Sequence, residues 1–317
     1  MEEWVEGYLE KERTLAVKGV FILLVFLSHF SGYVRGDDLW LRAYRWASGF
    51  MGQSVVVPFL LYSGFGVMES LRAKGEAYRR TMPRRRILGT LLRFDVAVLC
   101  FAALALALGH AFSWRQFALS LVAWDSLGNS NWYIFVILVC YAVAWAVGRH
   151  SVWWLCAGLS AAMIGLASCR PPWWSNTILA FAFGAVYSVY REPLERFLRR
   201  WYWPLFASLA AVYSALWFVE CVPHLACLVG NCRALLFAIL VVMATMKVRL
   251  DSPVLRWFGA NLFAVYIYQR VPMIALSETM PQWFCGIRAF AALFVCLSTT
   301  VAIAALVRKA EGRLAPR

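Results

Sequence analysis

The chain has 317 residues, of which 62% are hydrophobic and 15% charged, and its mean hydropathy is +0.65. Soluble domains carry about a quarter charged residues, so this composition excludes an ordinary soluble enzyme and indicates a polytopic membrane protein. The formal net charge is +14, but Lys and Arg cluster in short segments between apolar runs. That distribution is typical of cytoplasmic loops facing anionic lipid, and it argues against nucleic acid as a partner.

Ten apolar segments have the length of a membrane-spanning helix, and Trp and Tyr lie at many of their ends, as expected at the headgroup level. The segments cover residues 14–33, 48–69, 87–109, 131–148, 152–169, 173–190, 203–220, 230–247, 256–277 and 284–307. No small-residue cleavage site follows the charged start, so we expect the first helix to remain in the mature protein. The polar interruptions are too short to fold alone. The sequence therefore predicts an all-α fold with one transmembrane domain over residues 1–317.

The loops between these segments alternate in charge. Basic residues gather in the loop at 72–86 and in the even-numbered loops beyond it, whereas the intervening loops carry mostly single arginines. By the positive-inside rule, both ends of the sequence are predicted to be cytoplasmic. Residues 34–47 are the exception, because they should lie outside but contain Arg35, Arg42 and Arg45.

The first segment carries two ionisable residues, Lys18 and His29, eleven positions apart. Eleven residues make almost three helical turns, so both side chains share one face and lie roughly 16 Å apart along the axis. Half of the hydrocarbon core is about 15 Å, which puts His29 near mid-membrane if Lys18 is at the inner edge. An imidazole there can take a proton from a hydroxyl, or it can simply pack against a backbone carbonyl. Lys18 can reach lipid headgroups or meet a phosphate from the cytoplasm.

The second segment contains Pro58-Phe-Leu-Leu-Tyr-Ser-Gly-Phe-Gly66. Its glycines, Gly64 and Gly66, favour tight helix packing or allow local unwinding, and Ser63 offers a hydroxyl there. The basic loop that follows ends in three consecutive arginines, Arg84, Arg85 and Arg86. Arginines at a helix entrance can clamp phosphates, or they can serve topology alone.

Several other groups are weaker candidates. His110 and Asp125 flank a loop that is predicted to be external. A cluster with metal-capable residue types lies at Cys221, His224, Cys227 and Cys232. Its spacing is compatible with a disulfide, with a metal site or with free thiols. Cys169 and Cys285 are also predicted outside and could pair there.

The order of these pieces is similar to that of a known family. The chain has Lys18-x10-His29, the segment 58–66, and a basic Tyr-Arg-Arg…Arg-Arg-Arg-Ile stretch after it. Asn131-Trp-Tyr-Ile-Phe135 opens a later helix, and Trp257-Phe-Gly-Ala-Asn-Leu-Phe-Ala-Val-Tyr-Ile-Tyr268 lies near the end. Together these motifs resemble the acyltransferase 3 family of integral membrane acyltransferases, over roughly residues 14 to 305.

The resemblance implies transfer of an acyl group, commonly acetyl, from cytoplasmic acyl-CoA across the plasma membrane. The implied acceptor is a hydroxyl of a cell-surface glycan or another envelope molecule, and no metal is implied. By position, His29 is the implied catalytic histidine and Lys18 the cation of the paired motif. Arg84 to Arg86 would lie on the donor's side.

Two positions depart from the family pattern. Lys18 stands where arginine is more common, which keeps the charge but loses the bidentate fork. The late motif usually ends Tyr-Leu-x-His, whereas here Tyr266-Ile-Tyr268 is followed by Gln269, which cannot act as a base. Arg270 follows at a depth similar to that of His29, where an arginine needs a partner or a wet cavity. We expect Tyr266, Gln269 and Arg270, with Ser63, to line a substrate cavity; the alternative for Gln269 and Arg270 is helix–helix packing.

The sequence therefore predicts an acyl-CoA-dependent O-acyltransferase in which His29 is the general base. N-acylation of an amino sugar is a second possibility within the same enzyme class. The rival from another class is a transporter or lipid flippase that passes a substrate through the polar cavity. Its expected features, paired broken helices and inverted internal symmetry, are not found in the sequence.

Overall fold

The computed structural model describes residues 4–148, 150–219 and 223–314. The fold is 81% helical, and the β-type pairing among the described residues is one isolated bridge between Arg35 and Cys285. The predicted all-α class is therefore confirmed. The chain divides into two compact units, each described here by itself, and the single domain over 1–317 stays a prediction.

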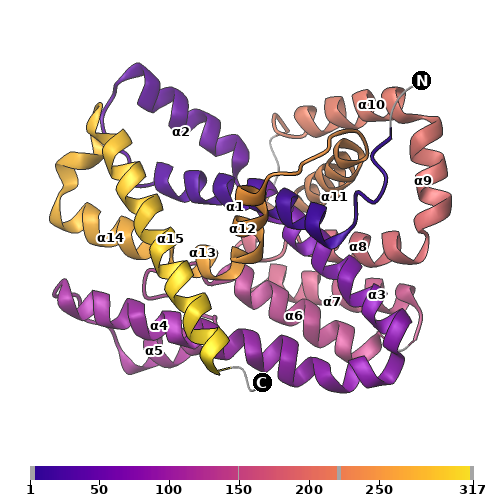
Figure 1. Ribbon diagram of the computed structural model, residues 1–317, viewed down its shortest axis with the longest axis horizontal. Coiled ribbons are helices and arrows are strands. Elements are labelled where there is room, and N and C mark those ends of the chain that lie inside the picture. The colour runs from indigo at the N-terminus through magenta and orange to yellow at the C-terminus, as the bar shows by residue number, and fades with distance from the viewer. Residues whose placement is uncertain (1–3, 149, 220–222, 315–317) are drawn as a thin grey trace. The chain divides into compact units, whose positions relative to one another are not determined.

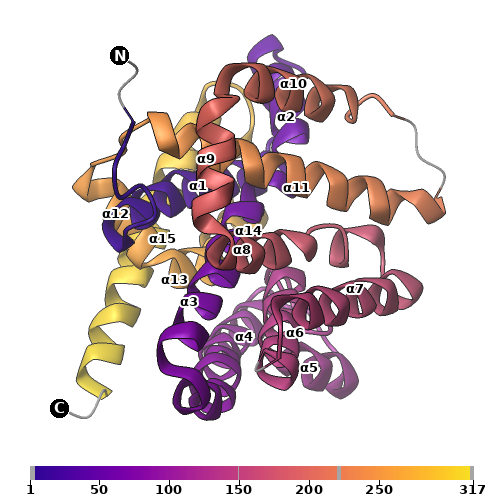
Figure 2. The same cartoon turned by 90° about the vertical axis from the view of Figure 1, so that its right-hand side faces the viewer.

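The first unit consists of residues 1–10, 56–90 and 132–250. Its helices are α3 (Val57–Met82), α6 (Trp132–Val147), α7 (Val152–Cys169), α8 (Leu179–Val189), α9 (Arg191–Arg200), α10 (Tyr202–Ala215) and α11 (Pro223–Lys247). A π-helical turn, Pro83–Leu88, follows α3, and a 3-10 turn, Pro172–Trp174, precedes α8. α8 packs against α3, α7 and α11, and Figure 2 shows α10 lying along α11.

The crossing of α3 and α8 depends on glycine. A Cβ atom at Gly64 would overlap the backbone carbonyl of Phe181, and one at Gly184 would overlap the carbonyl of Leu61. Small residues let two helix backbones approach in this way. Gly66, in contrast, has no atom within 4 Å of its Cβ position. Of the two glycines in the 58–66 motif, Gly64 thus serves tight packing and Gly66 does not.

The N-terminal residues are tied to the first unit by the buried side chain of Tyr8. Its hydroxyl is 2.5 Å from the hydroxyl of Tyr187 and donates to Glu195 Oε1 at 2.8 Å. Burial, followed by the neighbouring Tyr187 and Glu195, raises the pKa of Tyr8. Tyr8 therefore remains protonated and keeps its role as a donor.

The second unit consists of residues 11–55, 91–131 and 251–317. It holds α1 (Lys11–Ser31), α2 (Leu39–Met51), most of α4 (Gly89–Ala107), α5 (Trp114–Leu121), α12 (Pro253–Ala260), α13 (Leu262–Tyr268), α14 (Arg270–Thr279) and α15 (Arg288–Leu314). α1 and α12 lie side by side (Figure 1). Here too the approach needs glycine, because a Cβ at Gly19 would meet the carbonyl of Leu255 and one at Gly259 the carbonyl of Leu15.

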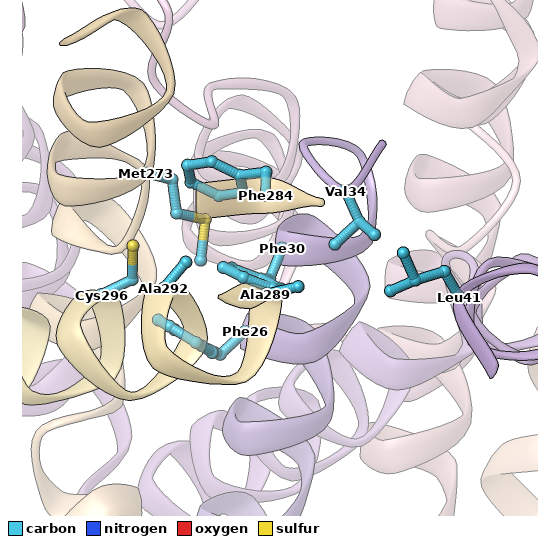
Figure 3. Packing of buried hydrophobic residues seen from close by; sticks show 9 residues of the cluster. All are labelled: Phe26, Phe30, Val34, Leu41, Met273, Phe284, Ala289, Ala292 and Cys296. Carbon is cyan, nitrogen blue, oxygen red and sulfur yellow. The ribbon is translucent and has the colours of Figure 1, made fainter. Parts of the chain in front are cut away.

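The apolar core of the second unit surrounds the C-terminal end of α1. Phe30 is 2% exposed and its ring centroid lies 5.4 Å from that of Phe284. Figure 3 shows these rings with their neighbours from α1, α2, α14, α15 and the segment after α1, namely Phe26, Val34, Leu41, Met273, Ala289, Ala292 and Cys296. This packing anchors the helical turn that carries His29.

Two predicted loops are helical in the structure. Residues 72–82 belong to α3, and residues 39–47 belong to α2. The first difference has a physical reason. The Ala, Lys, Glu and Arg residues there favour helix, and Glu76 pairs with Arg79 and Arg80 at helical spacing. Gly75, with φ of 52°, bends α3 within this stretch.

The predicted segment 256–277 is not one helix but three, α12 to α14. Asn261 departs from helical geometry with φ of −103° and ψ of 16°, and its side chain donates to the Trp257 carbonyl. This side-chain bond competes with the helix. Pro272 has no N–H for the carbonyl of Tyr268, four residues earlier, so the hydrogen-bond ladder breaks between α13 and α14.

Within the described ranges, five helical stretches are long and apolar enough to cross a membrane. They are Lys11–Ser31, Ser54–Ala107, Val152–Cys169, Leu225–Lys247 and Arg288–Glu311. The 54 residues of the second stretch would extend about 80 Å if straight, more than one hydrocarbon core of about 30 Å. A count of ten spans is not confirmed, because α8 and α10 are only 11 and 14 residues long and 256–277 is broken.

Candidate active site

His29 lies two residues before Ser31, the last residue of α1, a helix that continues without a break from Lys11. Lys18 lies on the same helix, so the predicted register of the two residues is confirmed, with both on one face and roughly 16 Å apart along the axis. Both side chains are partly buried. His29 is therefore not an exposed residue, and it does not line any of the described cavities.

Ser130 contacts the imidazole directly. Its hydroxyl oxygen is 3.2 Å from His29 Nδ1, and the residue is 5% exposed. This contact fixes the rotation of the ring and leaves Nε2 on the opposite edge for another partner. No pattern in the sequence points to Ser130, although Asn131 immediately after it belongs to one of the motifs that resemble the family.

The loop that presents Ser130 has a tightly bonded backbone. Ala123 and Gly128 both adopt positive φ, 57° and 106°. Asn129 Oδ1 accepts from the backbone N–H of Leu127 at 3.0 Å, and Asn131 Nδ2 donates to the Ala123 carbonyl at 3.1 Å. Such side-chain bonds hold a loop in one conformation without regular secondary structure.

Tyr266 of α13 is the aromatic neighbour of His29, with 6.3 Å between the two ring centroids. Four residues after His29 and Tyr266 in the sequence come Tyr33 and Arg270, and Arg270 Nε donates to the Tyr33 hydroxyl at 3.0 Å. The spacing is four residues on both sides, which is about one turn, with Tyr33 in the turn that follows α1 and Arg270 at the start of α14. Of the predicted cavity residues, the structure thus brings Tyr266 and Arg270 to His29.

Gln269 lies between them but faces elsewhere. It is fully buried, its Nε2 donates to the Tyr266 carbonyl at 3.0 Å, and its Oε1 has no partner among the described residues. It does not line any of the described cavities. Its position is that of a helix-packing residue, the alternative considered from the sequence.

A cavity of about 360 Å³ opens beside Tyr33 and Arg270. Polar groups from three segments line it, including Gln116, Ser126 and Ser277. His110 and Glu278, whose side chains approach to 3.9 Å, lie at its exposed end. The remaining lining residues are Phe101, Leu104, Ala105, Leu108, Ala111, Phe112, Leu127, Gly128 and Ile274. His110 thus belongs to this cavity, which the sequence did not indicate.

The other predicted site residues lie in the first unit. Arg84, Arg85 and Arg86 are exposed on the π-helical turn, and the Arg86 guanidinium lies 5.9 Å from the ring centroid of Tyr141. Ser63 is partly buried in α3 near the same tyrosine. The structure places these residues together within their unit, whereas His29, Lys18, Tyr266 and Arg270 belong to the other unit.

The cysteines carry no disulfide in the described part of the chain. Cys227 and Cys232 are free thiols, and the Ser175 hydroxyl donates to Cys227 Sγ at 3.2 Å. Cys169 and Cys285 are also free thiols; they belong to different units, so their pairing stays a prediction. Cys221 and the His224 side chain lie outside the described residues.

Comparison with known proteins identifies the family. Residues 16–308 match the profile of the acyltransferase 3 family, which is described as an acyltransferase domain. This match covers most of the chain, so the protein belongs to that family and is a membrane acyltransferase in general class. Neither the curated proteins nor the solved structures give a significant match.

Proposed function

We propose that this membrane acyltransferase transfers an acyl group, in the simplest case acetyl, from cytoplasmic acyl-CoA to a hydroxyl of an extracytoplasmic glycan or envelope molecule, with His29 as general base. The observation that carries the proposal is the His29 imidazole itself. It is held by Ser130 at 3.2 Å on a helix of transmembrane length, four residues before Tyr33, which lines a polar cavity. An ionisable group in such a segment is costly and calls for a function.

The proposed reaction is a direct transfer. His29 Nε2 accepts the proton of the acceptor hydroxyl while the oxygen attacks the thioester carbonyl carbon. A carbon–oxygen bond forms and the carbon–sulfur bond breaks. The thiolate then takes the proton from the imidazolium, which yields an ester and CoA with a free thiol. Because a thioester is already activated, alignment and one proton transfer are the main requirements.

Lys18 and the three arginines suit the donor. In the predicted topology Lys18 lies roughly 16 Å from His29 toward the cytoplasm, so it can meet a CoA phosphate while the thioester reaches the imidazole. Arg84, Arg85 and Arg86 are exposed cations on the predicted cytoplasmic side and supply the forked donors that phosphates prefer. In this proposal the enzyme resides in the plasma membrane, and the acceptor approaches from the opposite face.

The test uses the full chain in membrane vesicles or nanodiscs with labelled acetyl-CoA. We expect His29→Ala to lower transfer, or hydrolysis in the absence of acceptor, by about 10²–10⁴-fold, the usual contribution of a general base. His150→Ala is the matched control, because this histidine is exposed and belongs to the other unit. Full activity of the His29 variant would refute the proposal.

Two further outcomes of the same assay are informative. Export of an envelope molecule that needs no acyl-CoA and survives His29→Ala would favour the transporter or flippase. Labelled product that resists mild alkali would be an amide rather than an ester. The enzyme would then acylate an amino group while His29 keeps the same role.

A further inference from the structure

Arg270 brings a permanent positive charge to the cavity beside Tyr33. Its Nε donates to the Tyr33 hydroxyl, and the guanidinium lies 5.9 Å from the Tyr33 ring centroid. Within the described ranges, no carboxylate forms an ion pair with it. A guanidinium cannot lose its proton in a protein, and it has five N–H donors. The outer nitrogens of Arg270 are therefore strong donors without a carboxylate partner in a partly buried position.

Three neutral side chains of the cavity, Gln116, Ser126 and Ser277, differ from Arg270, because they carry no charge and each already donates one hydrogen bond within the protein. Gln116 Nε2 donates to the Ser126 carbonyl at 3.0 Å, and the Ser126 hydroxyl to the Asn129 carbonyl at 2.6 Å. Ser277 likewise donates to the Ile274 carbonyl at 3.0 Å. What these side chains still offer a ligand is acceptor oxygens and the second N–H of the Gln116 amide, groups that suit hydroxyls.

The carboxylate of Glu278 does not cancel the charge of Arg270. It lies at the exposed end of the cavity and forms no ion pair with Arg270; its Oε1 is 3.9 Å from Nε2 of His110. The cavity thus has a cation at its inner end and acceptor oxygens along its walls. Its volume of about 360 Å³ falls within the range of about 300–1,000 Å³ that is typical of small-molecule sites.

We propose that this cavity binds the acceptor, and that the acceptor is a polyhydroxyl molecule with an acidic group, a carboxylate or a phosphate, which Arg270 binds. The role of the ligand as acyl acceptor rests on the proposed function, whereas the binding of an acidic ligand at Arg270 does not. The register supports the assignment. Tyr33 and Arg270 line the cavity, and each follows by four residues a member of the pair His29 and Tyr266, a spacing of about 6 Å along a helix. His29 itself does not line the cavity, so a ligand whose acidic group lies on Arg270 has to extend past Tyr33 for its hydroxyl to meet the imidazole.

The experiment measures binding of three small probes to the full chain in nanodiscs, without acyl-CoA. Glucuronate carries the carboxylate, glucose 6-phosphate the phosphate, and glucose neither. We expect one or both acidic sugars to bind about ten- to hundredfold more tightly than glucose, the size expected for charge-assisted hydrogen bonds. Arg270→Gln should remove this difference, and Arg270→Lys should keep part of it, because lysine keeps the charge but not the fork.

Arg115→Gln is the matched control. It removes one positive charge from the neighbouring α5, but Arg115 is exposed and does not line the cavity. The preference for acidic sugars should be unchanged in this variant. If it falls as far as in Arg270→Gln, the effect is one of net charge and the proposal is wrong.

Equal binding of all three probes by the wild-type protein would overturn the inference even if Arg270→Gln did not fold. That result would leave the proposed function intact, because His29→Ala would still abolish acyl transfer. Conversely, acidic sugars that bind through Arg270 to a protein without transferase activity would support the site and refute the proposed reaction.

Discussion

The two nitrogen atoms of His29 have different surroundings, and this difference matters for its proposed role. Nδ1 faces the buried hydroxyl of Ser130 at 3.2 Å. When Nδ1 carries the proton it donates to Ser130, and Nε2 keeps the lone pair that a general base needs. Ser130 thus acts on the reaction through the imidazole and is, in this mechanism, a positioning residue.

Removal of the Ser130 hydroxyl tests this assignment. We expect Ser130→Ala to lower kcat by about two- to tenfold with little change in the KM for acyl-CoA, since one hydrogen bond contributes about 0.5–1.5 kcal/mol. Steady-state kinetics with labelled acetyl-CoA measure both constants. Ser31→Ala is the control, because that hydroxyl bonds to the Ser28 carbonyl of its own helix at 2.7 Å.

A different result would change the mechanism. If Ser130→Ala is as inactive as His29→Ala, the serine oxygen itself carries the acyl group in a covalent intermediate. Labelled acyl group retained on the denatured wild-type protein, and absent from the Ser130 variant, would establish that route.

The residues of the site differ in how far the sequence could predict them. Lys18 and His29 share one helix, so the helical period alone gave their relation. Arg270 stood out because a charge in an apolar segment is rare. Ser130 gave no such signal. It is 101 residues from His29 along the chain, and a serine before a helix is common in any protein.

At the scale of helices, the breaks around α13 shape the site. They separate α13 from α12 at Asn261 and from α14 near Gln269. Pro272 was visible in the sequence and, with its missing N–H, predicts such a break. The apolar run 256–277 nevertheless suggested one continuous span, because hydropathy does not record hydrogen-bond geometry. Non-helical backbone at such a depth is tolerated where protein or a cavity surrounds it.

The glycines of α3 provide a prediction for helix packing. We expect Gly64→Ala to destabilise the protein by about 1–3 kcal/mol, because the new methyl group would overlap the Phe181 carbonyl of α8. Gly66→Ala, two residues away on the same helix, has open space for its Cβ. It should be neutral, or stabilising by up to about 1 kcal/mol, since alanine favours helix over glycine. Unfolding in mild detergent, followed by circular dichroism, compares the two variants. Equal stability of both would show that α3 and α8 do not approach so closely.

At the scale of the whole molecule, composition was enough to predict a helical membrane protein, and the family match covers residues 16–308. The number of spans was harder to predict. Helices such as α8, with 11 residues, are shorter than the roughly 20 residues that a hydrocarbon core requires. The charge of residues 72–82 predicts a loop, yet most of these residues are good helix formers and the stretch belongs to α3. At this stretch helix propensity predicts a helix and charge predicts a loop outside the membrane. The secondary structure follows the helix propensity.

The predicted topology decides whether Lys18 lies on the side of the membrane from which acyl-CoA approaches, and fusions to reporter proteins test it. We expect a green fluorescent protein fused after residue 317 to fluoresce, because the Lys and Arg residues near it predict a cytoplasmic location. Alkaline phosphatase fused at residue 113, before α5, should be active, since that loop is predicted outside. A fusion at residue 251 should be inactive and serves as the internal control. The reverse pattern would put Lys18 on the outer side of His29, where no acyl-CoA is available. Lys18 could then no longer bind the donor's phosphate, and the cavity at Arg270 would face the cytoplasm instead of the envelope.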